Sequence, residues 1–153
     1  MDDIWFMKLA LEQAEMAYRL NEVPVGALVV SAEGKVLSSR FNTKEQDFDP
    51  CGHAEILAIR EAAQREKAWR LVGCSVYVTL EPCIMCLAAM GQARVGQLIF
   101  GAYDPKGGAL GLGYRVHADT RLNHRFAIKG GLLEFDCSKI LSQFFREQRS
   151  FYR

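Results

Sequence analysis

The sequence contains no long apolar run, and this excludes a chain built around transmembrane helices. The best apolar stretches, such as Ala27–Val30 and Val76–Leu80, are far shorter than the ~20 residues that a membrane-spanning helix requires. The first residues, Met1-Asp2-Asp3-Ile4, carry acids where a secretory signal carries Lys or Arg. We therefore expect a cytoplasmic protein with no membrane partner.

The chain also has little excess of either charge: 19 Lys and Arg stand against 18 Asp and Glu, and the net charge is +1. Half of its 153 residues are hydrophobic, which excludes intrinsic disorder and is enough for one buried core. The charge is unevenly divided, because residues 1–103 have net charge −3 and residues 104–153 have net charge +4. This asymmetry suits a polyanion-binding face, and it suits ordinary solvated arginines equally well.

Cysteine is scarce and odd in number, which argues against a disulfide framework. Five cysteines with a single CxxC pair indicate metal or redox chemistry together with bystander thiols. We expect Cys74 and Cys137 to be buried as small apolar residues. Of the three histidines, His117 and His124 show no metal-ligand spacing to any other candidate.

Internal repeats, low-complexity tracts and linker-like runs are all absent from the sequence, which predicts a single domain over residues 1–153. The alternation of strand and helix patterns predicts a layered α/β fold around a mixed sheet. The predicted elements are a helix over 3–20, strands over 25–30 and 35–39, a helix over 54–67, a strand over 75–79, a helix over 83–92, a strand over 97–102, an exposed glycine-rich loop over 104–113, a strand over 126–129 and a helix over 133–151.

The strongest chemical signal is divided between the starts of two predicted helices. His53-Ala54-Glu55 opens one helix, and the segment 82–86, Pro-Cys-Ile-Met-Cys, opens the next. Cys83 and Cys86 are three residues apart, so they project from one helix face and can hold one ion between them. Two thiolates and one imidazole make three protein ligands for zinc, which leaves the fourth position for water. Zinc lowers the pKa of such a water from 15.7 to roughly 7.

Glu55 lies two residues after His53, and we expect it to transfer protons rather than to bind the metal. Together the two segments match the known H-x-E…P-C-x-x-C pattern of zinc deaminases. Alone, a CxxC pair also suits a thioredoxin-like redox site. Cys51 is the rival metal ligand, but a fourth protein ligand would occupy the position of the water, so we expect it to be a bystander.

With these motifs and the segments around them, the chain resembles the cytidine deaminase superfamily and, within it, the tRNA-specific adenosine deaminases of bacteria. The zinc motif identifies only the superfamily, and the flanking segments narrow the resemblance to the tRNA enzymes. The chain departs from the family pattern at Cys51-Gly52, where Thr-Ala is usual, and at Leu110–Gly113, where the glycine loop is extended differently. The resemblance extends over nearly the whole chain, and the segments that carry it are Glu22–Ala27, His53–Glu55, Thr79–Cys86, Phe100–Ala109, Leu122–Arg125 and Phe144–Arg149.

The resemblance implies a three-layer α/β/α cytidine deaminase-like fold and a homodimer with one zinc ion per subunit. It implies hydrolytic conversion of adenosine to inosine at the wobble position (34) of a tRNA anticodon, chiefly in an arginine tRNA, with the anticodon stem-loop as partner. His53, Cys83 and Cys86 would bind the zinc, and Glu55 would carry protons. Asn42 would hydrogen-bond the purine, because an amide offers both a donor and an acceptor, although an ordinary turn residue is the alternative.

The resemblance also implies a set of RNA-contacting residues on the glycine-rich loop, in the 122–125 segment and on the last helix. Of the neighbouring Phe144 and Phe145, we expect one to be core and the other to line a groove. The implied contact residues are Asp104, Lys106, Asn123, His124, Arg125, Phe145, Arg146 and Arg149.

Two other functions compete with this one. The same zinc site could deaminate a free base or nucleotide, such as cytosine or guanine, which requires no basic second half. A zinc-dependent RNA-binding module or an inactive dimer partner is the alternative outside enzymes. Glu55 argues against it, because a purely structural zinc site has no use for a carboxylate there.

Overall fold

The computed structural model describes residues 2–151, with only the backbone for residues 150 and 151, so residues 1, 152 and 153 at the ends of the predicted domain lie outside the described residues. In chain order its elements are α1 (Asp3–Arg19), β1 (Gly26–Val30), β2 (Val36–Phe41), α2 (Ala54–Glu66), β3 (Ser75–Leu80), α3 (Ile84–Gln92), β4 (Gln97–Ala102), the 3-10 turn η1 (Val116–Ala118), β5 (Ala127–Lys129) and α4 (Glu134–Phe151).

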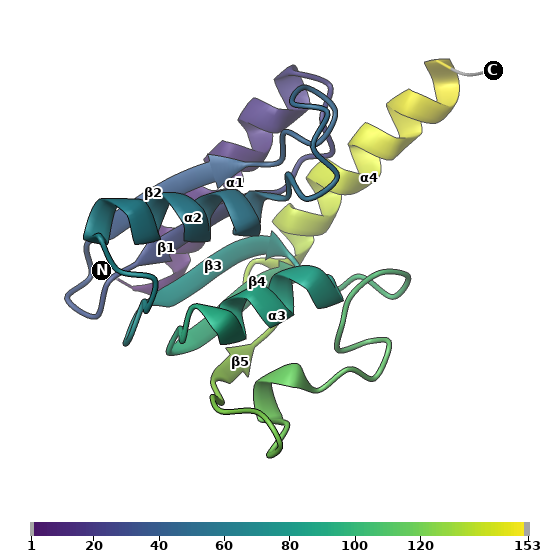
Figure 1. Cartoon of the computed structure of the whole chain (residues 1–153). Helices are drawn as coiled ribbons and strands as arrows, with labels where there is room; N and C mark the ends of the chain where they lie inside the picture. The colour runs from purple at the N-terminus through teal and green to yellow at the C-terminus, as the bar shows by residue number, and fades with distance from the viewer. Residues whose placement is uncertain (1, 152–153) are drawn as a thin grey trace.

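The five strands form one sheet in the order β2-β1-β3-β4-β5. β1 pairs antiparallel with β2 and with β3, whereas β3, β4 and β5 run parallel. α2 and α3 pack together on one face of the sheet, and α1 and α4 cover the other (Figure 1). This arrangement confirms the predicted three-layer α/β/α fold around a mixed sheet.

The central strands are buried on both faces because helices cover the sheet on both sides. All five residues of β1 are buried, as are most residues of β3 and β4, which explains their continuous apolar sequences. Cys74 and Cys137 lie in this core as free thiols, as predicted. Among the described residues, no helix is both long and apolar enough to cross a membrane.

α1 lies close to the start of β1, because from Ala10 onward the buried side chains of the helix are all alanine. Its N-cap, Asp2, accepts a hydrogen bond from the Trp5 amide at 2.9 Å. A side chain at Gly26 would collide with the carbonyl oxygen of Ala10, so only glycine fits where α1 crosses the start of β1. The buried residues of the helix are Phe6, Met7, Ala10, Ala14 and Ala17.

The glycine-rich loop over 104–113 is only partly exposed, which corrects the prediction. Gly108 is buried, and a side chain there would collide with the carboxylate of Glu81. That carboxylate is itself buried and accepts hydrogen bonds from the amides of Asp104 and Gly111, both at 3.0 Å. A buried carboxylate needs such donors, so the loop folds over it instead of extending into solvent.

Candidate active site

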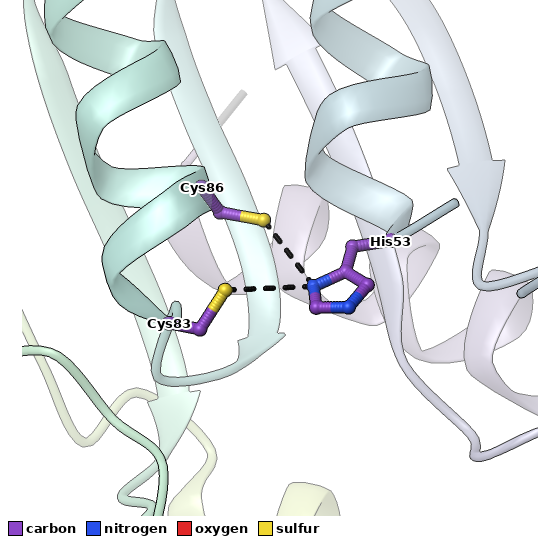
Figure 2. Close-up of side chains that lie close together, drawn as sticks. All are labelled: His53, Cys83 and Cys86. Carbon is purple, nitrogen blue, oxygen red and sulfur yellow. Dashed lines mark hydrogen bonds between the residues drawn. The ribbon is translucent and has the colours of Figure 1, made fainter. Parts of the chain in front are cut away.

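The residues of the metal motif meet at the start of two neighbouring helices. His53 is the N-cap of α2 and Cys83 is the N-cap of α3, and neither side chain caps its own helix. Cys86 lies in the first turn of α3, so both sulfurs point toward the histidine (Figure 2). The N-terminal ends of two helices carry partial positive charge, which favours thiolates at this point.

The spacing of the three side chains fits one zinc ion. Nδ1 of His53 lies 3.5 Å from Sγ of Cys83 and 3.5 Å from Sγ of Cys86 (Figure 2). Tetrahedral zinc, with Zn–S near 2.3 Å and Zn–N near 2.0 Å, places sulfur and nitrogen about 3.5 Å apart. Within residues 2–151, this is the one group of three His, Cys, Asp or Glu donors that comes together. The donor set therefore fits zinc as the cofactor, and it leaves a fourth position for water.

The two cysteines share one negative charge before any metal binds. Hydrogen bonds from the Cys86 thiol and from His53 lower the pKa of Cys83 to about 4, although burial opposes this shift. The pKa of Cys86 is raised because its proton is held against the Cys83 thiolate and because the group is buried. Binding of a cation must release that remaining proton, so metal affinity rises with pH.

Glu55 lies in the first turn of α2 with its side chain only 4% exposed. Burial raises the pKa of this carboxyl to about 7, and a cation bound nearby would lower it again by favouring the carboxylate. A carboxyl group that exchanges its proton near neutral pH is suited to general acid–base catalysis. Glu55 lines the same cavity as His53 and Cys83, and its role in proton transfer stays a prediction.

Metal-donor residues and the Glu55 carboxyl group border one cavity of about 200 Å³. His53, Glu55 and Cys83 line it together with Asn42 and with residues at the ends of β3 and β4. Its volume is below the 300–1,000 Å³ typical of sites for drug-sized ligands, so it suits one small ring system.

Asn42 faces this cavity and also organises the chain around it. Its Nδ2 donates to the carbonyl of Val23 at 3.1 Å, and its Oδ1 accepts from the amide of Lys44 at 3.1 Å. Each amide group keeps a second hydrogen or lone pair that can serve a ligand. The residue is therefore both the turn residue of the alternative interpretation and a cavity-lining group.

A larger groove of about 990 Å³ begins beside the cavity, and Asp104 lines both. Asp104 also accepts hydrogen bonds from the amides of Lys106 and Gly107, so it shapes the loop that borders them. Phe145 is 46% exposed and lines the groove, whereas Phe144 is buried, as the sequence predicted for the pair. The groove brings together five of the predicted RNA-contacting residues: Asp104, Lys106, Phe145, Arg146 and Arg149.

The other three lie apart from this groove. Asn123 and His124 line a separate cleft of about 330 Å³ with Gly91 and Gln92 at the C-terminal end of α3, whereas the zinc donors lie at the start of that helix. His124 places Nε2 2.7 Å from the carbonyl of Val95, and Arg125 donates to the carbonyl of Thr120 at 2.9 Å. The contact of these residues with RNA stays a prediction.

Sequence reasoning gave no role to Glu22, a buried carboxylate beside the cavity. It is 1% exposed and accepts hydrogen bonds from the amides of Glu45 at 3.1 Å and Gln46 at 2.8 Å. It thereby holds the loop over residues 43–52, which leads to His53. Cys51, in the same loop, is exposed and is not part of the metal-donor group, as expected.

The comparison with protein families agrees with the fold and the site. Residues 1–102 match the family described as the cytidine and deoxycytidylate deaminase zinc-binding region. The chain belongs to this family of zinc-dependent deaminases.

Comparison with individual relatives identifies the kind of deaminase more closely. The chain is 38% identical over 148 residues to the tRNA-specific adenosine deaminase of Streptococcus pyogenes serotype M1, covering 97% of this chain and 86% of that one. It is 42% identical over 147 residues to the enzyme of the same name from Bacillus subtilis strain 168, covering 96% and 91%. A structure solved in work on A-to-I editing by tRNA:A34 deaminases matches with a TM-score of 0.85 and 42% identity, covering 90% of this chain and 99% of that one. Within its family the chain is therefore a member of the tRNA-specific adenosine deaminases.

Proposed function

We propose that this chain converts adenosine to inosine, by hydrolysis, at the wobble position of a tRNA anticodon, with an arginine tRNA as the first candidate substrate. The observation that carries the proposal is a cavity the size of one base that is lined by a buried carboxyl and by two members of the three-residue zinc-donor group, and that adjoins a groove lined by cations. The cavity suits the target base, and the groove suits the backbone around it.

In this mechanism, zinc held by His53, Cys83 and Cys86 supplies the acidity that makes a bound water reactive near neutral pH. Glu55 accepts a proton from the attacking water and passes it to N1 of adenine while the C6–O bond forms. Glu55 then takes the proton of the new C6 hydroxyl and passes it to the amino nitrogen, so that C6=O forms as the C6–N bond breaks and ammonia leaves. The balance is adenosine plus water giving inosine plus ammonia.

We further propose that the anticodon stem-loop lies along the groove. The wobble base belongs to a single-stranded loop, so it can be splayed into the cavity without unpairing a duplex. Asn42 would read the purine edge through its remaining donor and acceptor. Lys106, Arg146 and Arg149 would lie against the backbone phosphates, and the 123–125 segment would contact RNA elsewhere on the surface.

The proposal includes a homodimer with one zinc ion per subunit, working in the cytoplasm where its tRNA substrate is. Sedimentation analysis of the zinc-loaded protein tests the first part, with a mass of two chains and a ratio of one zinc per chain as the expected result. A monomer that is fully active would contradict it.

Deamination of a free base or nucleotide is not favoured, because relatives matching almost the whole chain are tRNA-specific and because the large groove extends beyond what a free base fills. A zinc-dependent RNA-binding module without chemistry leaves the buried Glu55 unexplained.

The deciding experiment incubates the zinc-loaded protein with an anticodon stem-loop that carries adenosine at the wobble position. Nucleoside analysis then measures inosine, beside free adenosine, cytosine and guanine and a stem-loop with cytidine at the same position. We expect inosine from the adenosine stem-loop alone. Turnover of a free base with none in RNA would support the free-base enzyme, and bound zinc with no ammonia from any substrate would support the binding module.

A further inference from the structure

Tyr103 is an exposed aromatic residue at the groove for which the mechanism above has no use. It is the first residue after β4 and directly precedes Asp104, which lines both the zinc cavity and the groove. Tyr103 lines the groove and is 53% exposed, although its neighbours Gly101 and Ala102 are buried. The chain therefore changes from buried to exposed between Ala102 and Tyr103.

The ring of Tyr103 is supported from the core side. It packs edge-to-face against the buried Phe100, with the ring centroids 5.1 Å apart and the planes at 86°. Gly131 leaves room beside the ring, because a Cβ atom at that position would lie 3.5 Å from Cε2 of Tyr103. The contact with Phe100 restricts the ring while leaving about half of the residue exposed. A side chain that is already ordered loses little entropy when a ligand stacks on it.

Phe145 contributes a second aromatic surface to the same groove from α4. Its ring is also supported, by an edge-to-face contact with the buried Phe144 at 5.5 Å and 77°. Lys106 and Arg149 line the groove with these two rings. Fixed aromatic faces combined with cations are the means by which proteins bind single-stranded nucleic acid: bases stack on the rings and phosphates lie against the cations.

We propose that Tyr103 is a substrate-positioning residue whose ring stacks on the base of a nucleotide next to the target adenosine. The inference rests on the proposed function, because it takes the groove as the path of the RNA. When the target base is splayed into the cavity, its neighbours lose a stacking partner. Tyr103, adjacent in sequence to a cavity-lining residue, presents an aromatic face that replaces it.

The test compares the wild-type protein with Tyr103→Phe, Tyr103→Ala and Tyr114→Ala. Tyr114 is the matched control, since it is 49% exposed in the same connection but lines neither the cavity nor the groove. Inosine formation is followed on three stem-loops: one intact, one abasic at the nucleotide 5′ of the wobble adenosine, and one abasic at the nucleotide 3′ of it. Thermal unfolding and zinc content are measured for each variant.

We expect Tyr103→Ala to raise KM about 10-fold with kcat little changed, because one base–aromatic stack is lost. At one of the two flanking positions, the abasic substrate should raise the KM of the wild type by a similar factor. The same substrate should cause no further increase in the KM of Tyr103→Ala. Tyr103→Phe and Tyr114→Ala should behave as the wild type, because the first keeps the ring and the second lies away from the groove.

Any of three kinetic results would overturn the inference. In the first, the increases in KM caused by Tyr103→Ala and by each abasic substrate multiply, which shows that they act independently. In the second, Tyr103→Phe raises KM as much as Tyr103→Ala does. In the third, neither abasic substrate changes the KM of the wild type. A loss of dimer in Tyr103→Ala, with a KM insensitive to the neighbouring bases, would also overturn it and place the ring at a protein interface. Failure of the wild type to form inosine from the intact stem-loop would contradict the proposed function instead, so the two failures are distinguishable.

Discussion

Glu55, His53 and Cys83 line one cavity, and in the proposed mechanism the carboxyl group and the metal donors have separate tasks. The metal donors lie on helix caps whose partial positive charge favours thiolates. Glu55 lies in the same first turn as one of these caps, yet burial raises its pKa to about 7 and keeps it able to hold a proton. Metal binding and proton transfer can therefore be removed one at a time.

Replacement of Glu55 with alanine should leave one zinc per chain and abolish inosine formation. A positioned acid–base group contributes about 10²–10⁴-fold to the rate, and two proton transfers depend on this one. Zinc analysis and single-turnover assays on the stem-loop check both parts. Retained activity would remove Glu55 from the mechanism, and lost zinc would make it a structural residue.

Cys83→Ser should lower the zinc content well below one ion per chain, whereas Cys51→Ser should leave it unchanged. Cys83 is a member of the donor group and Cys51 is an exposed thiol outside it. Because zinc binds the folded state, added zinc should raise the Tm of the Cys51 variant and not that of the Cys83 variant. Equal loss of zinc in the two variants would show that Cys51 is a ligand.

At the scale of the elements, the sequence predicts best where a motif coincides with a helix start. The prediction that both zinc segments open helices is confirmed, and the caps are the ligands His53 and Cys83 themselves. Strand positions were also predictable, since uninterrupted apolar runs mark strands covered on both faces. The observed strands differ from the predicted ones only at their ends. The second strand, predicted over 35–39, runs from Val36 to Phe41, because its pairing with β1 continues to Gly26.

Loop structure was not predictable, because it depends on partners far away in the sequence. Glu81 draws the glycine-rich loop inward through the amides of residues 104 and 111, and Glu22 holds the loop over 43–52 in the same way. Local patterns identify an acidic residue at such positions, but they do not show that it is buried. Turn propensity therefore predicts that a segment is a loop, but it does not predict whether the loop folds against the core or extends into solvent.

Glu22→Ala should destabilise the protein by about 1–3 kcal/mol, because two backbone amides lose their buried acceptor. The effect should be concentrated in the loop over 43–52, where the amides of Glu45 and Gln46 donate to this carboxylate. Urea unfolding measures the first effect, and hydrogen exchange at those two amides measures the second. Unchanged protection of both amides would show that the carboxylate does not hold the loop.

At the scale of the whole molecule, the groove is assembled from segments that are distant in sequence. One side comes from the connection after β4 and the other from α4, about 40 residues later. The resemblance to the deaminase family indicated these residues one by one, but only the fold shows that Lys106 and Arg149 share a groove while Asn123 and His124 line another cleft. Such grouping depends on sheet order, which local periodicity does not predict.

The affinity for the stem-loop should fall steeply with salt, since cations in the groove displace counterions from the RNA. For single strands the slope of log K against log salt is about −0.7 per phosphate contact, so three groove cations predict a slope near −2. Arg149→Ala should make the slope shallower by about 0.7 without changing zinc content. Binding measured from low to moderate salt provides the check, and a flat profile would exclude phosphate contacts in the groove.

α4 borders the groove and carries none of the zinc donors, and this division of labour bears on how such proteins diversify. Substitutions in that helix could adapt the groove to another nucleic acid, or to a small molecule, while the zinc donors and the deamination reaction stay the same. Retargeting would then proceed through variation at one helix, without passing through forms that had lost their chemistry.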